Sequence, residues 1–352
     1  MLFYLNCDLP SLESCDQSAR DEALRAMLKA YRLGDHAIVI PRKICKFLID
    51  SADLSNAERA ILERIGLEFT QRADLPRRAS RFVLVSPAKQ VGQNQREISV
   101  TFDELIQSRV LDRSVLLVEN VRRDGLLYSE LMRGHFDLHG CPQPACESMH
   151  GGGADLKAVF VEQIKNRRIV CGIVDTDQHS PLSNSCSKRD SMVRIAGAMD
   201  WPLAFALSPP CREAENCLPM QVVMGLQSGQ LNSSNKHFIE IFDAERSLGQ
   251  EGVTSFWLFV DLKAGISEEI LSNIPNGYDR DWLETKLRLI GFDIGQLSIQ
   301  GYGDKIFDQI ASNGRHLSDL RTHTRKSDWR AIFADFMEQL LWIFAGGRRI
   351  AT

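Results

Sequence analysis

Long apolar runs, low-complexity stretches and internal repeats are all missing from this chain of 352 residues. Because no apolar run is long enough to cross a bilayer, the sequence predicts no membrane span. The first residues, MLFYLNCDLP, have no basic segment and reach Asp8 and Pro10 early, so they do not predict a signal peptide. Hydrophobic residues make up 44% of the chain and charged residues 25%, which is the balance of a globular protein with a real core, and we expect it in the cytoplasm.

Paired cysteine motifs are missing as well. The chain has nine cysteines, an odd number, and no CxxC pair. Reduced, buried thiols are therefore a simpler interpretation than a disulfide framework. The formal net charge of -4 gives no general attraction to nucleic acid, so any nucleic-acid-binding surface must be local.

The usual motifs for nucleotide binding and for a nucleophilic triad are also absent. There is no GxGxxG segment, and the triple glycine at Gly151–Gly153 is not followed by the Gly-Lys-Ser/Thr of a P-loop. These glycines suit either a simple turn or a set of backbone amides that cradle a phosphate before a helix. Any NTP-hydrolysing domain that acts with this chain must then belong to a partner protein.

By pattern, the chain divides into three parts. Residues 1–112 predict an N-terminal α/β unit whose role the sequence does not indicate, with a polar, boundary-like segment at 87–98. The pattern predicts a second α/β domain at residues 113–225 and a C-terminal extension of it at residues 226–352. Helical spacing or apolar strand patterns in the first part occur at 23–31, 36–41, 57–65 and 81–86.

The middle part alternates between strand and helix patterns. This order predicts a parallel sheet with helices on its faces. The crossovers are right-handed, so the carboxyl ends of the strands share one edge, where ligands of open α/β sheets bind. The strands are expected at 114–119, 168–174 and 202–207, and the helices at 122–133, 155–166 and 192–199.

The C-terminal part contains one further strand pattern and one long helix pattern. The strand is expected at 255–262 (SFWLFVDL) and the amphipathic helix at 327–345, before Gly346 and Gly347. The apolar stripe of this helix predicts a core or docking helix, and a self-association surface is the alternative.

Three carboxylates follow the apolar strands of the middle part. Glu119 ends one strand, and Asp175 and Asp177 follow another. Residues two apart in an extended chain point to the same side, so both aspartates can converge with Glu119. Because three neighbouring carboxylates resist ionising together, a hard divalent cation, Mg²⁺ or Mn²⁺, would resolve the conflict. Such a metal leaves positions for water and phosphate oxygens, as phosphoryl transfer requires.

Two other interpretations stay open for this region. The DTD segment alone is weak evidence for a metal site, since aspartates after strands often cap helices. A cluster of zinc-binding residue types also lies nearby, although its spacing matches no familiar zinc finger and a surface loop is the simpler interpretation. The cluster comprises His135, His139, Cys141, Cys146 and His150.

The order of the motifs resembles a known family. VLLVEN followed by Asp124, then GGGADLKAVF, GIVDTD and CREAENCLP, resembles the Toprim domain of OLD-type nucleases and their relatives in bacterial anti-phage systems. The resemblance covers roughly a third of the chain and implies a central Toprim-like parallel sheet.

The resemblance assigns roles to particular residues. It implies that Glu119, Asp175 and Asp177 bind the metal, and that Glu215 adds a ligand or positions water, with Glu213 beside it. It also implies that Lys263, directly after the strand expected at 255–262, stabilises charge on the phosphate.

Asn120 and Asp124 lie close to Glu119 in the sequence. Asn120 stands where the family usually has glycine, and asparagine tolerates the positive φ of a tight turn. Asp124 either joins the site or lies exposed in the first turn of a helix.

The implied activity is that of a Mg²⁺- or Mn²⁺-dependent endonuclease. DNA is the default substrate, and RNA, including tRNA, is the alternative. A separate ATPase partner and a defence role are implied as well, and a homodimer is an assembly that the resemblance allows. The alternatives are a regulatory or interaction subunit with a degenerate site, and a topoisomerase or primase, for which no gate domain is indicated among five tyrosines.

Overall fold

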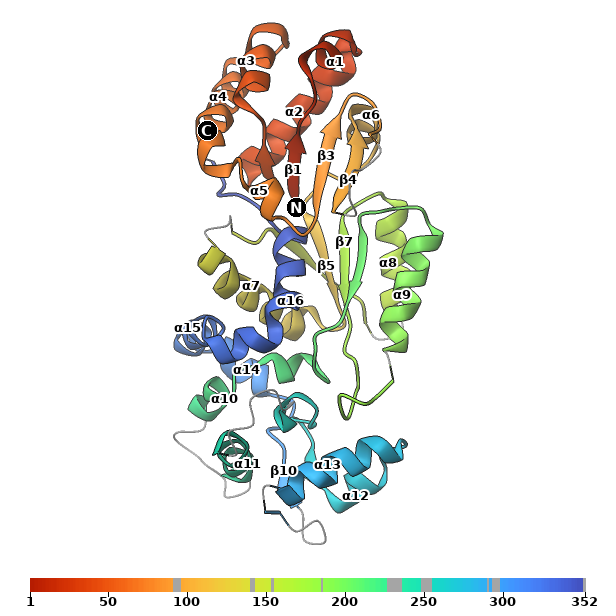
Figure 1. The fold of residues 1–352 in the computed structure, drawn as a ribbon, viewed down its shortest axis with the longest axis vertical. Coiled ribbons are helices and arrows are strands. Elements are labelled where there is room, and N and C mark those ends of the chain that lie inside the picture. The colour runs from red at the N-terminus through yellow and green to blue at the C-terminus, as the bar shows by residue number, and fades with distance from the viewer. Residues whose placement is uncertain are drawn as a thin grey trace.

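The computed structural model describes residues 1–90, 96–139, 143–152, 155–184, 186–226, 236–247, 255–289, 291–292 and 298–350. The expected α/β class is confirmed. Two four-stranded parallel sheets follow one another along an elongated molecule, with a mainly helical C-terminal region at the far end (Figure 1). In the part of the chain that is described, no helix combines the length and apolar character needed to span a bilayer.

The first sheet is built by the N-terminal residues. Its order is β2-β1-β3-β4 and all its pairs are parallel. The segment 87–98 does not separate two units, because β4 begins at Glu97 and pairs with β3 within the same sheet. The strands are β1 (Leu2–Leu5), β2 (Ala37–Val39), β3 (Phe82–Ser86) and β4 (Glu97–Thr101), and the helices are α1 (Leu9–Ser14), α2 (Gln17–Leu33), α3 (Arg42–Ser51), α4 (Asn56–Arg72), α5 (Leu75–Arg78) and α6 (Phe102–Gln107).

Local signals explain the longest of these helices. In α4, the Ser55 side chain accepts from the backbone of Glu58, and the Glu58 side chain accepts from Ser55, which completes a capping box. Helix α2 ends at Gly34, whose φ of 75° is in the left-handed region that glycine adopts without a Cβ penalty. A side chain at Gly34 would also collide with the carbonyl oxygen of Gly347, so the C-terminal tail lies directly against this turn.

The second sheet has the order β6-β5-β7-β8 and is also fully parallel. Helices α8 and α9 cover one face, and α7 and the terminal helix α16 cover the other (Figure 1). Its strands are β5 (Ser114–Val118), β6 (Cys146–His150), β7 (Val170–Ile173) and β8 (Ala204–Leu207); its helices are the π-helix η1 (Val121–Gly125), α7 (Leu126–His139), α8 (Leu156–Lys165) and α9 (Ser187–Ala198).

The segment expected to be loop-like, from His135 to His150, is largely regular. His135 is buried in α7, and Cys146–His150 forms the edge strand β6 beside β5. The strand was missed because an edge strand needs no continuous apolar run, and most of its side chains are only half-buried.

The C-terminal region contains mostly short helices. The strand expected at 255–262 is wrong: Phe256–Leu258 is a short 3-10 helix, η4. An apolar run marks burial, and here burial comes from packing around an irregular segment. The elements are η3 (Ala214–Cys217), α10 (Met220–Leu226), α11 (Lys236–Ser247), β9 (Gly265–Ser267), α12 (Glu268–Ser272), α13 (Gly277–Leu289), β10 (Ser298–Gln300), α14 (Ile306–Ala311), α15 (Gly314–His323) and α16 (Ser327–Ile343), with β9 and β10 paired antiparallel.

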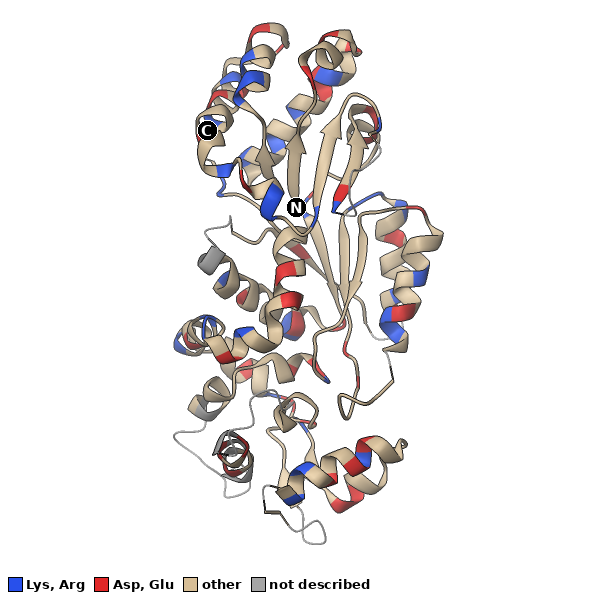
Figure 2. Ribbon diagram, viewed as in Figure 1, with Lys and Arg blue, Asp and Glu red and all other residues tan. Residues whose placement is uncertain are grey.

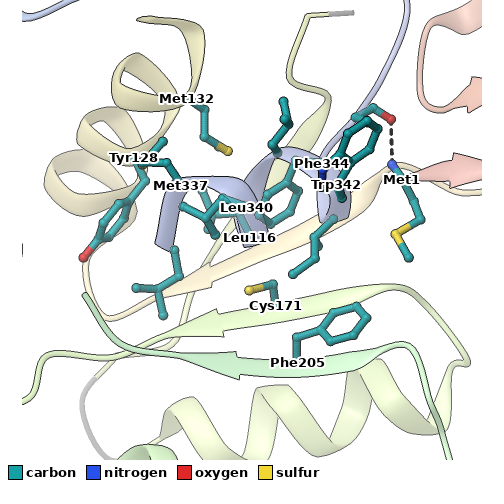
Figure 3. Packing of buried hydrophobic residues seen from close by; sticks show 14 of the residues in the cluster. Met1, Leu116, Tyr128, Met132, Cys171, Phe205, Met337, Leu340, Trp342 and Phe344 are labelled. Carbon is teal, nitrogen blue, oxygen red and sulfur yellow. Dashed lines mark hydrogen bonds between the residues drawn. The ribbon is translucent and has the colours of Figure 1, made fainter. Parts of the chain in front are cut away.

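Helix α16 returns from the C-terminal region to the centre of the molecule. Its side chains Met337, Leu340 and Phe344 lie among those of β5 and α7 in the core (Figure 3). At its end the Ala345 carbonyl accepts a hydrogen bond of 2.6 Å from the Met1 ammonium group. The expectation of a core helix is therefore confirmed, and this helix links the second sheet to the start of β1.

Candidate metal centre

The strand order of the second sheet defines where a ligand would bind. The chain runs from β5 outward to β6, then returns to the other side of β5 to form β7 and β8. The order therefore reverses between β5 and β7, and ligands of open α/β sheets bind at the carboxyl side of such a switch point. Glu119 directly follows β5, and Asp175 follows β7 after one residue, so the two predicted ligands flank this point. Strands β5, β7 and β8 contain no charged residue, whereas acidic and basic residues lie beyond their carboxyl ends (Figure 2).

Glu119 and Asp177 share one cation, Lys188, in the first turn of α9. The Lys188 Nζ lies 3.2 Å from Glu119 Oε1 and 3.0 Å from Asp177 Oδ2. Burial opposes the charged amine, but its bonds to Asp177 and Glu119 dominate and raise the pKa of Lys188. The Asp177 side chain is 54% exposed, so this end of the site faces solvent.

Asp175 has a different environment from Asp177, although only one residue separates them. Its Oδ1 accepts a hydrogen bond of 2.9 Å from the backbone nitrogen of Ala214. Burial, and then repulsion by the carboxylates of neighbouring residues, raises the pKa of Asp175 to about 8. These neighbours are Asp124, Glu215, Glu213 and Glu119.

The expected extended geometry of the DTD segment is wrong. Asp177 has a φ of 55°, in the left-handed region, which an extended strand does not contain. The backbone nitrogens of Thr176 and Asp177 both donate to the carbonyl oxygen of Arg212, each at 3.0 Å. The contact with the loop after β8, which brings Glu213 and Glu215 to the site, therefore sets the turn.

Glu213 and Glu215 share a second cation, Lys263. Its Nζ lies 2.7 Å from Glu213 Oε2 and 3.3 Å from Glu215 Oε1. Burial raises the pKa of Glu215 despite this partner. Although the strand expected around Lys263 does not form, the structure still brings this lysine to the two glutamates.

Hydrogen bonds from η3 hold the glutamates in place. The Asn216 side-chain nitrogen donates to the carbonyl oxygens of Trp257 at 2.6 Å and Val260 at 2.9 Å. The Trp257 indole returns a hydrogen bond of 3.1 Å to Leu218. The segment around η4 therefore supports the glutamates from behind.

Asp124 lies beside the candidate ligands, and the alternative of an exposed helix residue is wrong. It is partly buried, and its Oδ2 accepts a 2.9 Å hydrogen bond from the backbone nitrogen of Asn120. Burial raises the pKa of Asp124, and the charge of Glu119 adds to this effect. The turn expected at Asn120 does not need a positive φ, because its φ is -130°. Its side chain instead caps η1 by accepting from the backbone nitrogens of Arg122 and Arg123.

A divalent cation suits the chemistry of this donor set. Two lysines and one arginine lie beside the carboxyl groups, and burial together with neighbouring carboxylates raises the pKa of Asp175 to about 8. A bound metal would relieve that repulsion. As the side chains stand, no three His, Cys, Asp or Glu of the described residues form a group that could hold a metal, so both lysines would have to move aside. The carboxyl groups are Glu119, Asp124, Asp175, Asp177, Glu213 and Glu215.

The zinc site that was the alternative interpretation of the segment from His135 to His150 does not form from the residues that are described. Cys146 and His150 lie at opposite ends of β6, and His135 is buried in α7. Cys141 and the side chain of His139 lie outside the described residues. The four-residue separation along a strand, about 13 Å, prevents Cys146 and His150 from sharing one ion.

The glycines before α8 have local explanations. Gly152 has a φ of 49°, and a Cβ at Gly151 would come within 2.8 Å of the Leu156 side chain. Gly153 lies outside the described residues. These two constraints account for a turn that packs closely on α8, and they require no bound phosphate.

Sequence reasoning missed Lys188. Nothing in its local pattern, an exposed lysine at the start of a helix, distinguishes it from other surface lysines. Its position opposite Glu119 results from the crossover between β7 and β8.

Comparison of the chain with models of protein families, with curated proteins and with solved structures found no match.

Proposed function

We propose that the protein is a metal-dependent nuclease whose centre is formed by Glu119, Asp175, Asp177 and Glu215. The observation that carries this proposal is the position of Asp175. It lies at the switch point of a parallel sheet, and burial and surrounding carboxylates raise its pKa to about 8. Strongly perturbed carboxyl groups at such a position are typical of functional sites.

The chain supplies ligands, countercharge and support in this proposal. When bound, Mg²⁺ or Mn²⁺ would polarise a phosphodiester and lower the pKa of a water molecule. Glu119, Asp175 and Asp177 hold the cation, and Glu215 completes the shell. Lys263, released from its glutamates, offsets charge on the phosphate.

The substrate and the biological setting rest on the resemblance to Toprim nucleases. DNA is the proposed substrate, with RNA, including tRNA, as the alternative that an assay must separate. A separate ATPase subunit and a role in bacterial anti-phage defence belong to the same proposal, as do a cytoplasmic location and a homodimeric assembly.

Cleavage assays test the activity directly. The purified protein should cleave plasmid DNA or RNA with Mg²⁺ or Mn²⁺ and not with EDTA. The double variant Asp175→Ala/Asp177→Ala should lose this cleavage, whereas Asp50→Ala, which removes an exposed carboxylate on α3, should keep it. Cleavage that persists in the double variant would contradict the proposal.

A regulatory or interaction subunit with a degenerate site is the second candidate. The observation that favours it is the ammonium group of Lys188, which bridges Glu119 and Asp177 at the place where a metal would bind. A Mn²⁺ titration by calorimetry separates the two candidates. Tight, stoichiometric binding supports the nuclease, and no binding supports the degenerate site.

A further inference from the structure

A buried tyrosine next to the candidate metal centre has no partner for its hydroxyl group. Tyr128 lies in α7 and is 1% exposed. Its ring packs edge-on against Phe336 of α16, with the ring centres 6.0 Å apart. Among the described residues the hydroxyl makes no hydrogen bond. Figure 3 shows the hydroxyl at the edge of the hydrophobic cluster, pointing away from Met337 and Leu340.

A fully buried hydroxyl without a partner is unusual and requires an explanation. Burying a hydroxyl unpaired costs about 1–3 kcal/mol, whereas a phenylalanine would fill the same space without that cost. Such groups in folded proteins commonly bind an ordered water or serve a functional site. The surroundings of the group therefore decide its role.

Tyr128 follows Asp124 of the candidate centre on adjoining helical segments, η1 and α7. Tyr128 is one helical turn beyond Asp124, so the two side chains share a face of the helix. Burial raises the pKa of Tyr128, and interactions with Cys217, Asp175, Cys211 and Asp124 raise it further.

Two carboxylate oxygens beside Tyr128 have spare capacity. Asp124 accepts its hydrogen bond at Oδ2, and Asp175 accepts its hydrogen bond at Oδ1. Asp124 Oδ1 and Asp175 Oδ2 accept none from the described residues. A water molecule that reached these two oxygens and the Tyr128 hydroxyl would have three polar partners, the number that a buried water typically has.

We infer that Tyr128 is a positioning residue that, through a bound water, orients Asp124 and the free oxygen of Asp175 toward the cation. The inference rests on the proposed function, because it gives Asp175, a proposed metal ligand, a hydrogen-bonding partner that does not itself bind the metal. Outer partners of metal ligands fix the orientation of the ligand, and their loss weakens metal binding by roughly 10- to 100-fold.

Titration of Mn²⁺ into the full-length Tyr128→Phe protein tests the inference. The change keeps the ring and removes only the hydroxyl, so the fold should persist with a melting temperature near that of the wild type. The Mn²⁺ dissociation constant should rise roughly 10- to 100-fold. Because Asp124→Asn disturbs the same water, its effect and that of Tyr128→Phe should be less than additive in the double variant.

Tyr302 provides a matched control. Its hydroxyl also lacks a partner among the described residues, but burial alone raises its pKa to about 12, with no contribution from a carboxylate. The Tyr302→Phe protein should therefore bind Mn²⁺ like the wild type. The inference would be overturned, and the proposed function left standing, if Tyr128→Phe bound Mn²⁺ with the wild-type dissociation constant. The same would follow if Tyr302→Phe weakened Mn²⁺ binding as much as Tyr128→Phe does. Absence of Mn²⁺ binding by the wild type would overturn the proposed function together with it.

Discussion

Replacing Asp175 by asparagine should stabilise the metal-free protein at neutral pH, although most substitutions of hydrogen-bonded residues destabilise a fold. Burial, and then repulsion by other carboxylates, raises the pKa of Asp175 from 3.8 to about 8. When folding raises the pKa of an acidic side chain, the free energy of unfolding of the protein falls as the pH rises from the unfolded-state pKa to the folded-state pKa. The loss therefore accumulates between about pH 4 and pH 8.

The two pKa values give the size of the effect. Keeping the carboxyl of Asp175 protonated costs about 2 kcal/mol of folding free energy at pH 5 and about 4 kcal/mol at pH 7. Asparagine has the shape of a protonated carboxyl, has no charge to desolvate, and can keep the hydrogen bond from Ala214. Asp175→Asn should therefore recover most of this free energy.

Urea unfolding in EDTA at pH 5, 7 and 8.5 measures the difference. The free energy of unfolding of Asp175→Asn should exceed that of the wild type by a margin that widens from pH 5 to pH 7 and levels above pH 8. The exposed Asp281 on α13 is the control, and its asparagine variant should change stability by less than about 0.5 kcal/mol. A variant less stable than the wild type at pH 7, or a margin independent of pH, would refute the reasoning. Saturating Mn²⁺ should reverse the order, since the metal stabilises the protein that binds it.

Three further predictions concern the two lysines and the terminal helix. The Lys188→Met protein should bind Mn²⁺ more tightly than the wild type in calorimetry, because no ammonium group then competes for Glu119 and Asp177. Weaker Mn²⁺ binding by this variant would contradict the prediction. Lys263→Gln should lower the free energy of urea unfolding at pH 7 by about 1–3 kcal/mol, because two largely buried glutamates lose their cation. An unchanged unfolding midpoint would show that Arg212, which also pairs with Glu213, suffices. Leu340→Ala should lower the free energy of unfolding by about 2–5 kcal/mol, because Leu340 is fully buried. Replacement of the exposed Ile332 on the same helix by alanine should have little effect. Equal losses in the two variants would mean that α16 does not pack in the core as described.

Several features could be predicted from the sequence because they depend on local pattern. Short, fully apolar runs before Glu119 and Asp175 gave β5 and β7, and the alternation with helices gave a parallel sheet. Since parallel strands end at a common edge, the position of these carboxylates followed directly. The apolar stripe of α16 likewise indicated a core helix.

Other features could not be predicted because they depend on packing between distant segments. The run at 255–262 is apolar since it packs behind η3, and periodicity alone does not distinguish such a segment from a strand. The left-handed turn at Asp177 depends on the Arg212 carbonyl, 35 residues later.

The sequence by itself determined the class of the fold and the set of acidic residues at one sheet edge, because hydrophobic periodicity and strand direction are local properties. Only the tertiary structure decided how those acids are neutralised. Lys188 reaches Glu119 from α9, Lys263 arrives from the C-terminal region, and the Tyr128 hydroxyl is buried without a partner among the described residues. Charge balance acts through space, so it depends on contacts that no local pattern encodes.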